Sequence, residues 1–96
     1  MINTPIYLVP CDFSEMSDHA LKLSLEIARI NQGEIMLFHV IKDKSDKVKT
    51  KLKFQQIMDD LSYADKKIVT YRVIYGSLYD EISKAIQIIR PAMVIM

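Results

Sequence analysis

The sequence predicts an α/β fold, a three-layer sandwich in which a parallel sheet carries helices on both faces. Four short apolar segments alternate with three segments of helical periodicity, which is typical of such a sheet. The first two apolar segments, residues 6–11 and 34–40, are continuous rather than alternating, as in strands covered on both faces. A polar break follows at residues 12–14. It marks a candidate ligand site, because open α/β sheets bind ligands at the carboxyl ends of their strands.

The composition indicates one small domain and excludes several classes of function. The 96 residues carry a net charge of +1, from 13 basic and 12 acidic side chains, so no strong field attracts nucleic acid. No apolar run reaches the roughly 18 residues of a membrane span, and residues 1–5 lack a signal-peptide pattern. The single cysteine, Cys11, cannot form an internal disulfide, and no Cys/His cluster indicates a metal site. We therefore expect a cytoplasmic protein without membrane, nucleic-acid or metal partners.

The first strand is expected over residues 6–11 and the first helix over residues 17–31. Ser14 or Ser17 can cap this helix. Its apolar and small residues recur at helical spacing on one face: Ala20, Leu21, Ser24, Leu25, Ile27 and Ala28. Gly33 is expected to end the helix in the left-handed conformation.

The second strand is expected over residues 34–40, followed by a loop rich in lysine and aspartate. A second helix is predicted over residues 46–61, with Val48, Leu52 and Met58 on its inner side and Gln55 or Gln56 between them. The lysines of residues 42–53 are interpreted as a solvated face. Residues 62–67 are expected to form a polar connection.

The third strand, residues 68–75, is expected at a sheet edge because it alternates and contains Arg72. Gly76 then turns the chain, and Ser77 with Asp80 resembles a capping box for a third helix, which ends before Pro91. The apolar stripe of that helix is Leu78, Ile82, Ala85, Ile86 and Ile89. Residues 92–96 read as a fourth buried strand.

Motifs at these boundaries resemble those of the universal stress protein family. They are Val9-Pro10-Cys11-Asp12-Phe13-Ser14, Leu37-Phe38-His39-Val40, and Gly76 followed by Glu81-Ile82 and Ala85. The similarity covers essentially the whole chain. It implies a Rossmann-like fold, like that of the adenine nucleotide alpha hydrolases, with strand order 3-2-1-4-5. This chain is then expected to be a single universal stress protein domain over residues 1–96, incomplete at its C-terminus, with strands in the order 3-2-1-4 and no fifth strand.

The resemblance also implies a partial adenine-nucleotide site, for ATP or AMP. In nucleotide-binding members, the aspartate after strand 1 and the valine ending strand 2 hold adenine, which correspond here to Asp12 and Val40. Pro10 and Cys11 belong to the same first motif, and Met96 matches the start of the ribose-contacting segment. The family's glycine loop, G-x2-G-x9-G-[ST], which wraps the phosphates, has no counterpart in this sequence.

Three functions stay open. The first is a stress-response domain whose longer form binds ATP or AMP; the second is a nucleotide-independent interaction or dimerisation module. The third is a nucleotide-dependent enzyme, which we do not expect because Ser14 and Ser17 have no evident base and no catalytic set emerges. Asp12 could equally cap the turn that follows it, and Cys11 and His39 read as ordinary core residues. The apolar strand at residues 93–96 predicts self-association as a homodimer.

Overall fold

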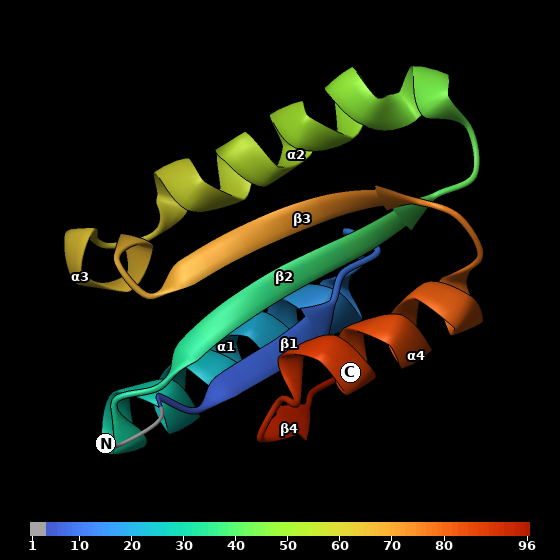
Figure 1. Cartoon of the computed structure of the whole chain (residues 1–96). Coiled ribbons are helices and arrows are strands. Elements are labelled where there is room, and N and C mark those ends of the chain that lie inside the picture. Colours follow the sequence, from blue (N-terminus) through green and yellow to red (C-terminus); the bar gives the residue numbers. More distant parts are fainter. Residues whose placement is uncertain (1–3) are drawn as a thin grey trace.

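The computed structural model describes residues 4–96 as a four-stranded parallel sheet between two layers of helices (Figure 1). The strands are β1 (Ile6–Pro10), β2 (Glu34–Ile41), β3 (Val69–Tyr75) and β4 (Met93–Val94). They lie in the order β3-β2-β1-β4, and every pairing is parallel. The predicted fold class and strand order are confirmed, and β3 lies at a sheet edge as expected.

The helices divide between the two faces because the path of the chain reverses after β3. Helices α1 (Glu15–Asn31) and α2 (Lys47–Asp60) share one core cluster, while α4 (Leu78–Ile89) packs in a separate cluster on the opposite face. Right-handed crossovers require this arrangement when the chain moves one way from β1 to β3 and then back to β4. Neighbouring side chains of β1 alternate accordingly: Val9 packs toward α1, and Leu8 toward α4. In residues 4–96, no helix is long and apolar enough to cross a membrane.

Helix α1 begins two residues earlier than predicted. The Ser14 hydroxyl accepts a hydrogen bond from the Ser17 backbone N–H at 3.3 Å, so Ser14 is the cap. At the other end Gln32, not Gly33, takes the left-handed conformation, with φ of 59°. Gly33 is needed for a different reason, because a Cβ placed there would lie 2.7 Å from the Tyr7 ring.

Helix α2 lies within one residue of its predicted bounds, but of the predicted inner face only Met58 packs against the core. Val48 and Leu52 are 70% and 62% exposed, whereas Phe54 is fully buried. The inward face consists of Thr50 and Phe54 with the partly buried Ile57, Met58 and Leu61. The predicted and the observed inner faces both fit helical spacing. The large ring of Phe54 favours the observed face, because it stacks on Tyr71 of β3 with 4.7 Å between the ring centroids.

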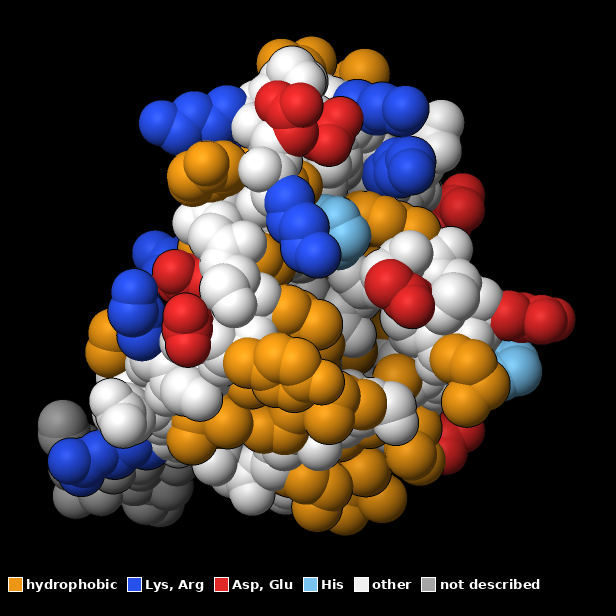
Figure 2. Space-filling view, turned by 90° about the vertical axis from the view of Figure 1, so that its right-hand side faces the viewer, with side chains coloured by type: hydrophobic (Ala, Val, Ile, Leu, Met, Phe, Trp, Pro, Cys, Tyr) orange, Lys and Arg blue, Asp and Glu red, His pale blue; other side chains and the backbone are white. Residues whose placement is uncertain are grey.

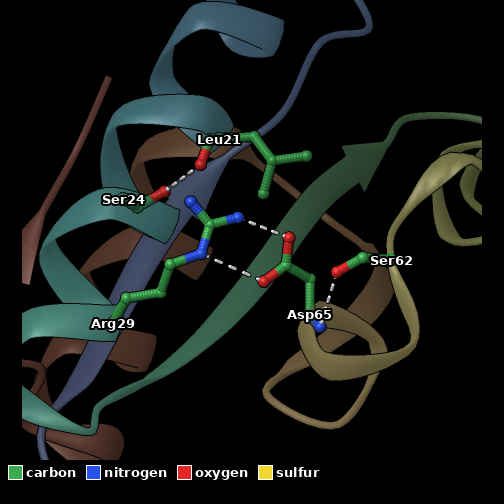
Figure 3. Close-up of polar contacts among 5 residues, drawn as sticks. All are labelled: Leu21, Ser24, Arg29, Ser62 and Asp65. Carbon is green, nitrogen blue, oxygen red and sulfur yellow. Dashed lines mark hydrogen bonds and ion pairs between the residues drawn. The ribbon is translucent and has the colours of Figure 1, made fainter.

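The predicted polar connection after α2 contains a one-turn helix, α3 (Tyr63–Lys66). The Ser62 hydroxyl accepts the Asp65 backbone N–H at 3.2 Å. The buried Asp65 carboxylate accepts two hydrogen bonds from Arg29 of α1, at 2.6 Å from Nη2 and 3.3 Å from Nε. Figure 3 shows this fork joining α3 to α1. A contact between residues so far apart in sequence leaves no local signal.

Helix α4 and β4 are less buried than predicted. Ser77 makes no side-chain hydrogen bond as a cap, so the predicted capping box is wrong. Ala85 is the one buried residue of α4, and Leu78 and Ile86 are 45% and 42% exposed. Strand β4 has two residues rather than five, although the backbone N–H groups of residues 92 and 95 still donate to β1 at 2.8 and 2.9 Å.

Candidate functional site

A cavity of about 380 Å³ opens at the carboxyl edge of the sheet, where β1 and β2 end and α4 begins. Figure 2 looks onto this edge, toward which the strand arrows of Figure 1 point. Hydrophobic side chains gather around a hollow in the lower half of that view, and Lys and Arg side chains lie above it. The topology explains the position, since the strand order reverses between β1 and β4 and open α/β sheets bind ligands at such a point.

The structure brings all five predicted site residues to this one cavity: Pro10, Cys11, Asp12, Val40 and Met96. They come from three segments, namely the end of β1 with its following turn, the end of β2, and the residues after β4. The backbone N–H of Cys11 donates to the Phe38 carbonyl at 2.7 Å, which holds the first two segments together. Their part in nucleotide binding stays a prediction.

Asp12 is an exposed carboxylate in a tight turn. Its Oδ1 accepts the Ser14 backbone N–H at 3.0 Å. The hydroxyl of Ser14, together with this N–H, holds the pKa of Asp12 below its ordinary value. The side chain is therefore ionised at neutral pH. It supports its own turn, as one sequence interpretation suggested.

Phe13 sits between Asp12 and Ser14 with φ of 64°, an uncommon conformation for an aromatic residue. Such backbone strain costs on the order of 1–3 kcal/mol and is found at functional sites. The Phe13 ring packs on the opposite side of the sheet from α4, with centroids 5.0 Å from His39 and 4.9 Å from Phe54. This packing holds the turn that places Asp12 at the cavity. No local sequence signal indicated the left-handed conformation of Phe13.

Cys11 is a buried core residue, as predicted, whereas His39 is only partly buried and lines the cavity. The Cys11 thiol is buried, and its Sγ lies 3.7 Å from the Ser17 hydroxyl. The His39 Nδ1 lies 2.6 Å from the Cys11 carbonyl oxygen. Because a carbonyl only accepts hydrogen bonds, Nδ1 carries the proton.

Sequence reasoning missed several residues that line the cavity. Leu78 and Ile82 were assigned to the core stripe of α4, but they form a wall of the cavity. Lys42 is its one lysine or arginine, and Met16 is a further apolar member. The sequence did contain a signal for Leu78 and Ile82. They begin the apolar stripe of α4, which starts directly after β3 and so lies level with the carboxyl ends of the strands. Lys42 gave no signal within a run of lysines.

A second cavity, of about 410 Å³, lies on the other face between α1 and α2. It shares Cys11, Ser14 and Ser17 with the first cavity, and Lys53 and Ile57 of α2 line only the second. Neither Asp12, Val40 nor Met96 reaches it. Within residues 4–96, no group of three His, Cys, Asp or Glu side chains is placed to hold a metal ion.

Comparison with known proteins gives a consistent result. The model of the universal stress protein family matches residues 6–96. The solved universal stress protein UspA from Lactobacillus plantarum is 16% identical with a TM-score of 0.79, over 99% of this chain and 77% of that chain. Universal stress proteins from Archaeoglobus fulgidus (21% identity, TM-score 0.70, 93% of this chain and 31% of that chain) and Burkholderia pseudomallei (20%, 0.69, 93% and 77%) share the fold. No curated protein sequence matches this chain.

Proposed function

The chain belongs to the universal stress protein family, and on that premise we propose that it is a cytoplasmic stress-response binding domain whose cavity takes an adenine nucleotide, AMP or ATP. The observation that supports this most is the meeting of Pro10, Cys11, Asp12, Val40 and Met96 on one cavity. The cavity also has the size of a small-molecule site, since such sites measure about 300–1,000 Å³.

The chemistry of the cavity suits a purine base. Its walls are largely apolar, with Phe38, Val40, Ile82 and the flexible Met96 available to pack against a flat ring. Asp12 is the one carboxylate that lines it. Because one Asp12 oxygen is occupied by the Ser14 N–H, the other would accept a hydrogen bond from the exocyclic amine of adenine.

Recognition of phosphate is expected to contribute little. The sequence has two glycines, Gly33 and Gly76, and neither lines the cavity. The exposed Lys42 is its one strong cation. An exposed ion pair contributes up to about 1 kcal/mol, so ATP should bind within about tenfold of AMP.

Calorimetric titration with AMP and with inosine monophosphate tests the proposal. The two nucleotides differ at the group that would face Asp12, an amine in AMP and a carbonyl in inosine monophosphate. We expect AMP to bind about tenfold more tightly, the equivalent of one hydrogen bond of about 1.4 kcal/mol. Equal affinities, or no binding of AMP, would contradict the proposal.

A matched pair of variants sharpens this test. Asp43 stands in a turn like that of Asp12, with its Oδ1 accepting the Ser45 N–H at 2.9 Å, and it does not line the cavity. Asp12→Asn should abolish the preference for AMP, because an amide NH₂ can face the carbonyl of inosine monophosphate. Asp43→Asn should preserve it.

We also propose that the domain binds nucleotide without hydrolysing it. The His39 Nδ1 is engaged with the Cys11 carbonyl, and the Ser14 hydroxyl serves as the cap of α1. Neither arrangement is that of a nucleophile activated by a base. Release of ADP from ATP by the purified domain, above the rate in buffer, would contradict this.

A second candidate function, homodimerisation, is favoured by the edge formed by β4. In the described part of the chain this strand pairs with β1 alone, and Met93 within it and Met96 just after it are 50% and 81% exposed. Unpaired apolar edges favour association. In sedimentation velocity we expect a dimer. Met93→Lys should weaken this dimer, and the control Thr70→Lys, at the exposed β3 edge on the other side of the sheet, should leave it unchanged. A monomer at high concentration would contradict this.

A further inference from the structure

The outward face of helix α2 has no role in the functions proposed above. The helix lies along β3 and turns Thr50 and Phe54 toward the sheet (Figure 1). On the opposite side of the helix, Val48 and Leu52 are exposed. Because they are four residues apart, these two side chains lie one above the other. They form a short apolar strip that faces solvent.

Lysines border this apolar strip on both sides. With about 3.6 residues per turn, Lys49 and Lys51 lie roughly 80° to either side of it. Both are exposed, and in the part of the chain that the structure describes neither forms an ion pair or lies over an aromatic ring. Lys44 and Lys53, by contrast, each lie over an aromatic ring. The fold therefore leaves the charges of Lys49 and Lys51 uncompensated.

The charges of α2 are the reverse of those that stabilise a helix. Its first turn holds Lys47 and Lys49 and no acidic residue, and its last turn holds Asp59 and Asp60 and no basic residue. The N-terminus of a helix carries partial positive charge, so lysines there and aspartates at the C-terminus are unfavourable. Asp46 precedes the helix but makes no side-chain capping hydrogen bond. Folding alone does not explain this pattern, and an anionic partner beside the lysines would relieve it.

From these observations we propose that the outward face of α2 docks an acidic amphipathic helix of a partner protein. Val48 and Leu52 pack against the apolar face of that helix, and Lys49 and Lys51 pair with the acidic side chains that border it. An apolar seam with flanking charges of opposite sign is how two helices select each other. The proposal is independent of the adenine site, since none of these four residues lines either cavity.

Two other occupants fit this face less well. A second copy of the domain would bring lysines against lysines, which repel each other. A membrane surface requires apolar and aromatic side chains that can enter the lipid interface, and the one aromatic ring of α2, Phe54, is buried against the sheet. An acidic helix satisfies both the apolar strip and the lysines.

Fluorescence anisotropy with a labelled synthetic peptide tests the proposal. The probe has three heptads with leucine at the seam and glutamate at the flanking positions, and the control peptide carries lysine in place of glutamate. We expect the glutamate peptide alone to bind, with an affinity that falls as salt is added. Equal binding of the two peptides would contradict the proposal. So would binding to vesicles that contain phosphatidylserine without binding to the glutamate peptide.

Matched variants test where the peptide binds. Lys49→Glu and Lys66→Glu change the net charge equally, but Lys66 lies on α3. Lys49→Glu should weaken binding of the glutamate peptide about fivefold, because an attractive pair becomes a repulsive one. Leu52→Ser should also weaken it, and Lys66→Glu should leave it unchanged. Equal losses in Lys49→Glu and Lys66→Glu would indicate general charge attraction and overturn the proposal.

The reversed charges of α2 give a second readout. Because Lys49 lies in the first turn of α2, Lys49→Glu should raise the midpoint of thermal unfolding by roughly 2–5 °C while it weakens peptide binding. A fall in the midpoint would show that Lys49 serves the fold and would overturn the proposal. The affinity for AMP should not change in this variant, so the docking face and the adenine site can fail separately.

Discussion

Helices α1 and α4 lie on opposite faces of one sheet, but they are buried to very different degrees. Helix α1 buries six side chains, and α4 buries one. On the α1 side, a core of twelve buried residues joins three strands to two helices, while the α4 side holds a buried cluster of three. The cavity with the predicted site residues opens beside α4. Stability is therefore concentrated on the α1 side, and the predicted site residues lie at the cavity of the less buried α4 side.

The largest difference between the two sides is expected from core truncation. Phe54→Ala removes a fully buried ring from the α1 side, and should lower the free energy of unfolding by about 3–5 kcal/mol. Ile88→Ala, at an 81% exposed position of α4, should change it by less than about 0.5 kcal/mol. Urea unfolding measures both, and Phe54→Leu serves if the alanine variant does not fold. Similar losses for Phe54→Ala and Ile88→Ala would contradict the comparison.

Ion pairs should follow the same division. Asp65 is buried and joins Arg29 through two hydrogen bonds, whereas on α4 the partly buried Glu81 meets the exposed Lys84 in a single contact of 3.4 Å. Asp65→Asn should cost about 1 kcal/mol, because Arg29 is partly solvated and the pair is partly screened. Glu81→Gln should cost less than about 0.5 kcal/mol. Equal losses of stability for Asp65→Asn and Glu81→Gln in thermal unfolding would show that burial does not determine how much each ion pair stabilises the domain.

Helix caps offer a smaller contrast between similar serines. Ser14 caps α1 through its hydroxyl, and Ser77 makes no such bond at α4. Ser14→Ala should therefore destabilise the domain by about 1 kcal/mol, and Ser77→Ala by only a few tenths. A larger loss for Ser77→Ala would indicate a cap at α4 that the structure lacks.

The smallest effect concerns pH and separates stability from binding. The serine hydrogen bonds that lower the pKa of Asp12 and of Asp43 stabilise the fold when each carboxyl is ionised. This contribution is present above the ordinary pKa of 3.8 and is lost as pH falls through the lower folded value. Asp12→Asn and Asp43→Asn should thus destabilise the domain similarly at pH 7 and approach the parent protein in acid. Only Asp12→Asn should alter AMP binding.

Much of the fold could be predicted because strand and helix periodicities are local. The failures arose where distant residues decide the outcome. Helical spacing could not tell Val48 and Leu52 from Phe54 and Ile57, since only the position of the sheet selects the inner face. Gly33 was read as a cap, but the Tyr7 ring requires it there and leaves the left-handed conformation to Gln32.

For the candidate site, the resemblance identified residues that the structure does gather on one cavity. The resemblance could not show that the first turns of α4 line the cavity, because this depends on how far the helix extends beyond the carboxyl ends of the strands. The strained Phe13 was also missed, since packing against His39 and Phe54 holds it. The two cavities, one on each face of the sheet, share lining residues from the turn at residues 11–14. That arrangement follows only from the three-dimensional fold.

The central claim is that the α4 side, and not the α1 side, binds adenine nucleotide. Titration of AMP into ¹⁵N-labelled protein, followed by backbone amide chemical shifts, tests it most directly. We predict shifts at Asp12, Val40 and Ile82, with none at Lys53 or Ile57 of the second cavity. Shifts confined to Lys53 and Ile57, or no shifts at saturating AMP, would contradict the account.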